Sequence, residues 1–298
     1  MALRPRAVVI HRRTELEELV QRHATREQAE FFLRSRGRTL AQVDAGHAVV
    51  MEAHQTVLAA LPSTWAVAQV ERADLSRFLF APEDVVVVVG PDGLVANVAK
   101  YLTDQLVIGV NPEPAANPGI LVRHSPAEAA GLIGRLGTAG PGQVRCLALT
   151  MVEATVDDGR QLRALNEVYL GHPSHQSARY LLRCGDQSER QSSSGVIVGT
   201  GTGATGWCAS IVHDRGGGQL PKPSDAALAW FVREAWPSPV TGVNLTHGWL
   251  GPQDGLTITV AADQLVAFGD GIESDGLTLG WGQDVSFRVA ANRLRLAA

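Results

Sequence analysis

The sequence predicts an α/β N-terminal domain followed by a β-rich, sandwich-like C-terminal domain. Residues 7–111 alternate helical segments with continuous apolar runs, such as the five valines at 85–89. Apolar runs without alternation are typical of parallel strands that are covered on both faces. After about residue 112, short strand-like segments separated by glycine and turn residues dominate, which is the pattern of an antiparallel sandwich. A chain of 298 residues is long enough for two such domains.

The first domain starts with a short predicted strand at 7–10. Residues 14–37 and 39–62 then have helical composition and apolar spacing, and they end at Gly37 and Pro62. The remaining elements are strands at 66–75, 84–90 and 106–111 and a helix at 96–102. Because the Pro/Asn/Gly cluster at 111–119 is a boundary signal, we place this domain at residues 1–115.

The second domain consists mainly of short strands. We expect these strands at 144–156, 164–170, 178–184, 194–200, 255–261 and 284–290. Residues 224–236 have helical features, so one helix is expected among them. The sequence has no internal repeat and no low-complexity tract.

Composition and charge narrow the class of protein. A hydrophobic fraction of 45% with 19% charged residues indicates a soluble globular protein. The formal net charge of -4 argues against nucleic acid or an anionic membrane as a partner. We find no membrane-spanning stretch and no secretory signal. Cys146, Cys184 and Cys208 lack metal-ligand spacing, so we expect reduced, buried thiols in a cytoplasmic protein.

The strongest predicted strand ends in Gly-Pro-Asp-Gly, residues 90–93. Glycines let a backbone approach a phosphate closely, and a following helix N-terminus adds partial positive charge. Open α/β sheets bind ligands at this carboxyl end of a strand. Asp92 is therefore a candidate general base for a hydroxyl nucleophile, or a ligand for a metal that bridges phosphoryl oxygens. An ordinary turn, in which Asp92 bonds its own backbone, explains the same residues.

A second candidate segment, residues 199–207, alternates glycine with small and hydroxyl residues directly after a predicted strand. It offers several backbone donors and the hydroxyls of Thr200, Thr202 and Thr205, and Trp207 adds an aromatic surface for a base or ring. So many glycines are costly in chain entropy. A plain linker is the alternative, but linkers seldom follow a strand so abruptly, so we favour a binding loop.

A third candidate segment contains Asn166 and Glu167 in a predicted strand, where their side chains point to opposite faces. An edge strand would expose the same pair for no special purpose. His172, His175 and Arg179 follow in the next turn. Two histidines three residues apart, without an obvious third ligand, are poor evidence for zinc. We therefore expect a solvated or hydrogen-bonded turn there and no protein-held metal.

In their order and separations, the three segments resemble the NAD kinase family of the NAD kinase/diacylglycerol kinase superfamily. The family's Gly-Gly-Asp-Gly-Thr motif is similar to residues 90–94, its Asn-Glu pair to 166–167, and its Thr-Pro-Thr-Gly-Ser-Thr-Ala-Tyr loop to 200–207. Residues 107–114 resemble the family's strand ending in asparagine, here Asn111. The glycine after Thr200, together with Gly206 and Trp207, is similar to the divergent branch that includes the mitochondrial NAD kinases.

The resemblance implies an NAD kinase-like fold, in which residues 277–298 return to the first domain and 116–276 form a β-rich, NAD-binding domain. It implies ATP-dependent phosphorylation of the 2′-hydroxyl on the adenosine ribose of NAD(H) to give NADP(H), with Mg²⁺ accompanying ATP. Small-molecule nucleotides are then the partners, and we expect a homodimer or larger homo-oligomer.

The same match assigns roles to individual residues. Asp92 is the proton acceptor, and Gly90 and Gly93 shape the nucleotide-phosphate turn. Asn166 and Glu167 hold the adenosine portion of NAD. The residues that line the same nucleotide site are Thr200, Thr202, Gly203, Thr205, Gly206 and Trp207.

Some residues depart from the family motifs. Pro91 stands where the family has a glycine, which removes a backbone N–H from the phosphate turn, and Leu94 replaces a threonine. Ala204 and Trp207 stand where serine and tyrosine are usual. Two alternatives stay open: a lipid or sugar kinase of the same superfamily, and a catalytically silent NAD(P)-binding sensor. Pro91 and Leu94 favour the sensor, whereas the intact Asp92 favours the kinase.

Overall fold

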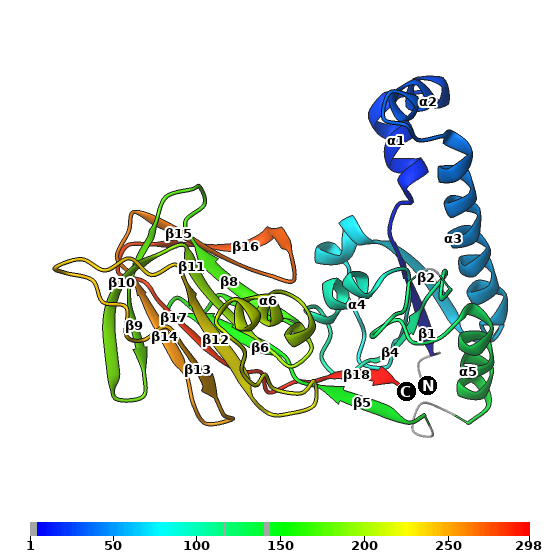
Figure 1. Ribbon diagram of the computed structural model, residues 1–298. Helices are drawn as coiled ribbons and strands as arrows, with labels where there is room; N and C mark the ends of the chain where they lie inside the picture. Colours follow the sequence, from blue (N-terminus) through cyan, green and yellow to red (C-terminus); the bar gives the residue numbers. More distant parts are fainter. Residues whose placement is uncertain (1–4, 116, 140–143) are drawn as a thin grey trace. The chain divides into compact units, whose positions relative to one another are not determined.

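The structure is a computed structural model that describes residues 5–115, 117–139 and 144–298 (Figure 1). The chain forms two compact units: unit 1 comprises Met1–Leu147 and Arg295–Ala298, and unit 2 comprises Ala148–Leu294. Unit 1 is α/β and unit 2 is a β-rich sandwich, so the predicted fold class is confirmed. Unit 1 extends beyond the predicted boundary at residue 115, because helix α5 (Pro126–Ala139) packs against α3 (Leu40–Ala60). Only the last four residues return to it, instead of the segment from 277.

Unit 1 is built on a six-stranded sheet with the order β2-β1-β3-β4-β18-β5. Strand β3 is parallel to both β1 and β4, and β18 pairs in parallel with β4. Every residue of β3 and of β4 is buried, as the continuous apolar runs predict. The strands are β1 (Arg6–His11), β2 (Ala66–Glu71), β3 (Val85–Val89), β4 (Leu106–Val110), β5 (Cys146–Leu149) and β18 (Leu294–Ala297).

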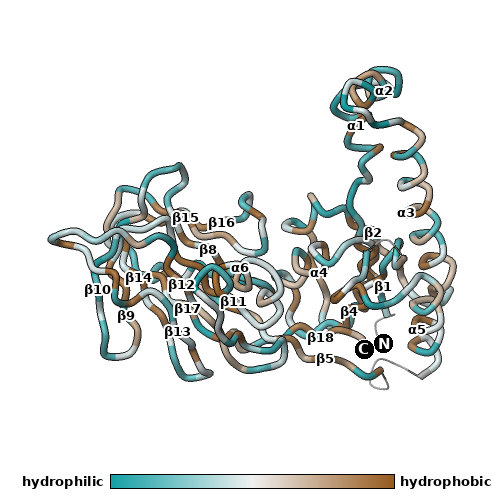
Figure 2. The backbone as a smooth tube through the Cα atoms, viewed as in Figure 1, coloured by the Kyte–Doolittle hydropathy of each residue, from teal (hydrophilic) through white to brown (hydrophobic). Residues whose placement is uncertain are grey.

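Alternate valines of β3 face the helices α3 and α5. Val85, Val87 and Val89 lie in one buried cluster with Val57 of α3 and Ile133 of α5. The tube in Figure 2 is brown along such buried strands and teal along most of the loops that join them. A short 3₁₀ helix, η1 (Arg72–Arg77), follows β2 where the sequence predicts a longer strand.

The predicted helix at 14–37 is instead two helices, α1 (Glu15–His23) and α2 (Arg26–Arg34). The break falls at Ala24, which has φ 63, and the side chain of Thr25 then caps α2 by accepting from the Gln28 N–H. Helix α4 covers Asp92–Ala99 and starts earlier than the predicted 96. Asp92 therefore lies in the first turn of a helix.

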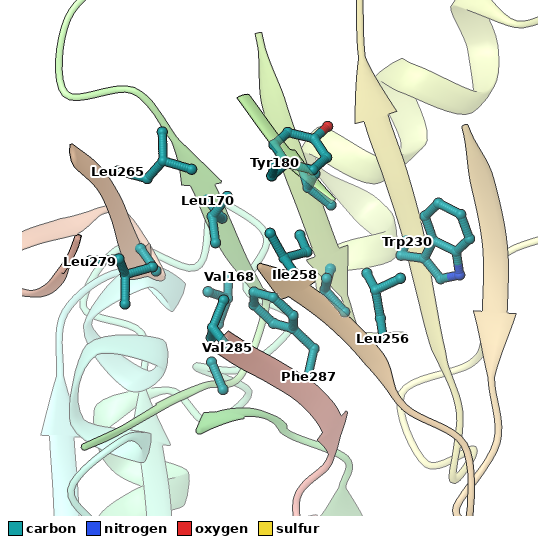
Figure 3. Close-up of a cluster of buried hydrophobic side chains, with 14 of the residues drawn as sticks. Val168, Leu170, Tyr180, Trp230, Leu256, Ile258, Leu265, Leu279, Val285 and Phe287 are labelled. Carbon is teal, nitrogen blue, oxygen red and sulfur yellow. The ribbon is translucent and has the colours of Figure 1, made fainter. Parts of the chain in front are cut away.

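Unit 2 consists of two six-stranded sheets with the orders β10-β9-β14-β17-β6-β7 and β13-β12-β11-β8-β15-β16. Their facing side chains form one core, which includes Tyr180 and Phe287 from the first sheet and Leu170 and Trp230 from the second (Figure 3). The strands are β6 (Val152–Val156), β7 (Gln161–Ala164), β8 (Glu167–Gly171), β9 (Ala178–Cys184), β10 (Gln187–Ser193), β11 (Gly195–Gly199), β12 (Leu228–Arg233), β13 (His247–Leu250), β14 (Leu256–Val260), β15 (Gln264–Gly269), β16 (Ile272–Gly280) and β17 (Asp284–Val289).

The predicted helix at 224–236 is wrong, because residues 228–233 form β12 between β11 and β13. A short apolar run fits a buried strand as well as a buried helix, and its periodicity cannot decide between them. The helix that covers this sheet is α6 (Trp207–Asp214), which packs on Ile197, Ala229 and Phe231 through Cys208. Cys208 is buried as expected, whereas Cys146 and Cys184 are only half-buried, and all three are free thiols.

None of the helices in the described part of the chain combines the length and hydropathy that a membrane crossing requires.

Candidate functional site

The Asp92 carboxylate is held by the backbone of a loop that follows β4. Its Oδ1 accepts from the N–H groups of Leu121 and Val122, at 2.8 Å and 2.9 Å. The N–H of Ile120 donates to both oxygens, at 2.9 Å to Oδ2 and 3.2 Å to Oδ1. A carboxylate offers about four lone-pair positions, so Oδ2 keeps one that these bonds do not use. These bonds are to distant residues, unlike those of a turn-forming aspartate.

A pocket of about 500 Å³ opens beside Asp92 within unit 1. Its wall includes Arg12, Gly90 and Asn111, which are the residues directly after β1, β3 and β4, respectively. These strands are parallel, so their carboxyl ends meet at one edge of the sheet, where open α/β folds bind ligands. His47 of α3 also lines the pocket and accepts or donates a bond with the Thr14 hydroxyl at 2.8 Å.

The two glycines that flank Pro91 and Asp92 differ in their surroundings. Gly90 has φ +153, and a Cβ there would lie 3.1 Å from Cδ2 of Leu94. Gly93 has no such constraint and faces open space, since a Cβ there would meet nothing within 4 Å. Gly90 is therefore required by the turn itself, whereas Gly93 leaves the first turn of α4 uncovered.

In unit 2 the Asn166–Glu167 pair is fixed by Asp270. One oxygen of Asp270 accepts from the Asn166 N–H at 2.7 Å, and the other from the Leu165 N–H at 2.8 Å. The Asp270 N–H in turn donates to the Glu167 carbonyl at 3.1 Å. Asp270 has φ 54, a left-handed conformation that aspartate tolerates better than most residues.

The glycine- and threonine-rich loop folds directly onto the same pair. The Thr200 N–H donates to the Asn166 carbonyl at 2.8 Å, and the Thr200 hydroxyl donates to the Leu165 carbonyl at 2.5 Å. That hydroxyl also accepts from the Thr202 N–H at 3.0 Å. A Cβ at Gly203 would collide with the Asn166 carbonyl. The structure thus brings two of the three candidate segments together.

Glu167 lies in a poorly solvated place beside this loop. Burial raises the pKa of its carboxyl group to about 7, and the nearby Asp270 carboxylate adds to the shift. Burial and then Glu167 also raise the pKa of the Cys208 thiol to about 12, so this cysteine stays neutral. The Thr202 hydroxyl is buried and has no hydrogen-bond partner among the described residues. A buried polar atom of this kind is costly until a partner reaches it.

The remaining candidates in the loop are less enclosed. Thr205 and Gly206 are exposed, and the Thr205 hydroxyl donates to the Thr202 carbonyl at 3.3 Å. The Trp207 indole stacks on the Tyr169 ring at 5.6 Å, and the Arg233 guanidinium lies 5.2 Å from its centroid. The indole is therefore contacted by two side chains of its own unit.

The histidines of the third candidate segment lie in a turn that is partly or fully exposed. His172 lies in a half-exposed turn, where its Nδ1 accepts from the Ser174 N–H at 3.1 Å, and His175 is exposed. Within residues 5–115, 117–139 and 144–298, no three His, Cys, Asp or Glu side chains gather in a way that could hold a metal ion.

Asp270 and the loop at 119–122 were not identified from the sequence. Asp270 belongs to a Gly-Asp-Gly turn, which signals a turn but not its partner. Residues 119–122 belong to the loop after β4. Loops at the carboxyl ends of parallel strands commonly form ligand sites, and this position was the signal that could have identified the loop. Asp92, Gly90 and Gly93 belong to unit 1, and the other predicted site residues belong to unit 2.

The fold is similar to that of yeast NADH kinase, whose crystal structure was determined in complex with NADH. The likeness has a TM-score of 0.61 at 13% sequence identity, and it covers 99% of this chain and 84% of that chain. It shows an NAD kinase-like fold. No family model and no curated protein sequence matches the chain.

Proposed function

We propose that this protein is an NAD kinase-like phosphotransferase, which transfers a phosphoryl group from ATP to the 2′-hydroxyl on the adenosine ribose of NAD(H). The observation that carries the proposal is the Asp92 carboxylate, oriented by three backbone N–H groups beside a pocket at the carboxyl edge of the sheet. The NAD kinase-like fold supports it. The assignment to the divergent branch with the mitochondrial enzymes rests on residues 200–207 alone.

In this proposal Asp92 accepts the proton of the ribose hydroxyl at Oδ2. The hydroxyl oxygen attacks the γ-phosphorus, its proton passes to the carboxylate, and the bond between the γ-phosphorus and the β–γ bridging oxygen breaks to release ADP. The backbone donors on Oδ1 hold the carboxylate in one orientation, so little reorganisation is needed when the hydroxyl arrives. The free lone pair of Oδ2 is the proton's destination.

Unit 2 supplies the proposed NAD-binding residues. The Asn166 and Glu167 side chains would contact the adenosine portion of NAD, and the loop of Thr200, Thr202, Gly203, Thr205, Gly206 and Trp207 would line the same site. The unpaired Thr202 hydroxyl supports this role, because a polar ligand would satisfy it.

Mg²⁺ would accompany ATP and neutralise charge on its phosphates. It commonly keeps several waters and binds through phosphate oxygens with one or two carboxylates. Glu113 lines the unit 1 pocket together with Asp92. Because the open position on Asp92 is the proposed proton acceptor, the Glu113 carboxylate is the one that would hold such a weakly bound ion. Gly90 and Gly93 would shape the turn beside it. Gly90 lines the pocket itself, and Gly93 follows Asp92 in the first turn of α4.

A catalytically silent NAD(P)-binding sensor is the second candidate. The same hydrogen bonds favour it, because a carboxylate that accepts from three backbone N–H groups also serves as a structural clamp. A lipid or sugar kinase of the same superfamily is a third. We further propose a homo-oligomer that acts in the cytoplasm on small-molecule nucleotides.

The test separates binding from turnover. The purified protein is incubated with ATP, Mg²⁺ and either NAD or NADH; NADP(H) is measured with a specific dehydrogenase, and NAD binding by calorimetry. We expect turnover that falls by a factor of about 10²–10⁴ in Asp92→Asn, with NAD binding retained. Asp74→Asn, an exposed aspartate of unit 1, is the matched control. NAD binding without turnover would favour the sensor. Phosphorylation of diacylglycerol, offered in place of NAD, would favour the lipid kinase.

A further inference from the structure

A second pocket, of about 680 Å³, lies in unit 2 on the solvent face of the sheet that contains β9, β10 and β14. It is lined by Arg179, Leu181, Arg190, Trp236, Val240 and Trp281, among others. The residues that line it do not include Asp92, Asn166, Glu167 or the loop at 200–207. We call it the Trp236/Trp281 pocket.

Three large apolar side chains around this pocket are largely exposed. Trp236 is 68% exposed, Val240 75% and Trp281 71%. Single exposed apolar residues are common on protein surfaces, but a group of them around one depression indicates a binding site. Indole rings offer large flat faces for an aromatic ligand.

Two arginines stand on the floor of the same pocket. Tyr180 and Gln191 are buried and paired across β9 and β10, so their neighbours Arg179 and Arg190 both point to the solvent face. Arg179 lies opposite Ser192 and Arg190 opposite Leu181. The two arginines are thus diagonal neighbours, for which Cβ atoms are about 7–8 Å apart, close enough to converge on one phosphate chain.

The charged side chains that line the pocket are all positive. Among the described residues that line it, two are arginines and none is acidic. Neither guanidinium has a hydrogen bond or an ion pair with the described part of the chain. The chain as a whole carries a formal net charge of -4. Two unpaired arginines in an acidic protein select an anion, and arginine is well suited to bind phosphate in two-pronged contacts.

The two tryptophans lie on segments that are already fixed. The backbone N–H of Trp236 donates to the Ser192 carbonyl at 2.7 Å, and the Thr241 hydroxyl donates to the Trp236 carbonyl at 2.8 Å. On the other side, the Gly282 N–H next to Trp281 donates to the Val260 carbonyl at 2.9 Å. A site whose walls are in place before binding loses less entropy when a ligand enters.

We infer that the Trp236/Trp281 pocket is a second ligand site of this protein, which takes an aromatic phosphate of nucleotide size. The tryptophans contact the ring and the arginines bind the phosphates. The volume lies within the range of small-molecule sites. This inference concerns a site separate from the proposed active site and does not depend on the proposed reaction.

Calorimetric titration with ATP tests the inference. We expect the double variant Arg179→Ala/Arg190→Ala to bind one equivalent of ATP fewer than the unmodified protein, and each single variant to weaken that equivalent by about tenfold or more. Adenosine and tripolyphosphate, which carry only the ring or only the phosphates, should bind this site more weakly than ATP. Trp281→Ala should weaken the same equivalent.

Two matched controls share the chemistry but not the pocket. Arg288 is exposed on the same sheet face, and Trp249 is 47% exposed on β13; neither lines the pocket. Arg288→Ala and Trp249→Ala should leave ATP binding unchanged. The number of ATP equivalents bound also separates this inference from the proposed kinase function. The double arginine variant should lose one equivalent whether or not the protein turns over NAD.

Three results would overturn the inference. The first is an unchanged number and affinity of ATP equivalents in the double arginine variant. The second is adenosine binding as tight as that of ATP, which would leave no role for the arginines. The third is a lower mass of Trp281→Ala by light scattering, which would make this surface a contact between copies of the chain.

Discussion

The backbone N–H of Val122 donates to Oδ1 of Asp92 at 2.9 Å and ties the loop after β4 to the first turn of α4. The residues are 30 positions apart in the chain. Since Leu121 and Ile120 donate to the same carboxylate, this side chain has a structural task whether or not it also accepts a proton.

We therefore expect substitutions of Asp92 to change stability as well as activity. Asp92→Ala leaves the N–H groups of the buried Leu121 and Val122 without acceptors, which should lower the free energy of unfolding by about 1–3 kcal/mol. Asp92→Asn keeps one oxygen acceptor and should lose less. Urea unfolding of both variants and of Asp74→Asn measures this. Equal stability of Asp92→Ala and the unmodified protein would contradict the clamp.

Glu167 predicts a pH dependence of stability. Its folded pKa of about 7 lies above the ordinary value of 4.5, so the folded state holds a proton that the unfolded state loses first. The free energy of unfolding should then fall as the pH rises from about 4.5 to about 7, by at most about 3 kcal/mol. Glu167→Gln removes this slope and should be the more stable protein at pH 8.

Thermal unfolding between pH 4.5 and pH 8 measures the effect. Glu273→Gln, which changes an exposed glutamate of the same unit, should keep the profile of the unmodified protein. Parallel profiles for Glu167→Gln and the unmodified protein would show that Glu167 does not titrate in this range.

Asp270→Asn tests the second cause of the Glu167 shift. Removing the negative charge should lower the pKa of Glu167, while burial, the larger cause, keeps it above 4.5. Asparagine also tolerates the left-handed backbone of position 270. The Glu167 side-chain carboxyl carbon signal, followed by NMR against pH, reports the shift. An unchanged midpoint would mean that Asp270 does not act on Glu167.

The two glycines around Asp92 should respond differently to alanine. Gly90→Ala places a Cβ at φ +153 and against Leu94, and we expect a loss of about 1–3 kcal/mol in the free energy of unfolding. Gly93→Ala meets open space in a helical turn and should stabilise the fold by up to about 1 kcal/mol. If Gly93→Ala still lowers turnover, the open backbone there serves the phosphates. Denaturant midpoints and the NADP(H) assay measure both effects.

Much of the architecture was accessible from the sequence because it follows from local pattern. The valines at 85–89 predict a strand buried on both faces, and β3 is such a strand. The strand expected at 178–184 coincides with β9. The prediction of a helix at 224–236 was wrong, because an apolar run as short as 228–233 is equally compatible with a buried strand.

The sequence by itself determined the two-part fold class and the order of the candidate segments, because burial patterns and turn residues act over short distances along the chain. Only the tertiary structure decided which groups meet. Asp92 binds the backbone of residues 120–122, and Ile120 is 28 positions from it in the chain. Asp270 binds the backbone of residues 165–167, and Leu165 is 105 positions from it. A carboxylate has many possible backbone partners, and the packing of the sheets selects among them. In the Trp236/Trp281 pocket, the strand register likewise decides that Arg179 and Arg190 lie on one face as diagonal neighbours.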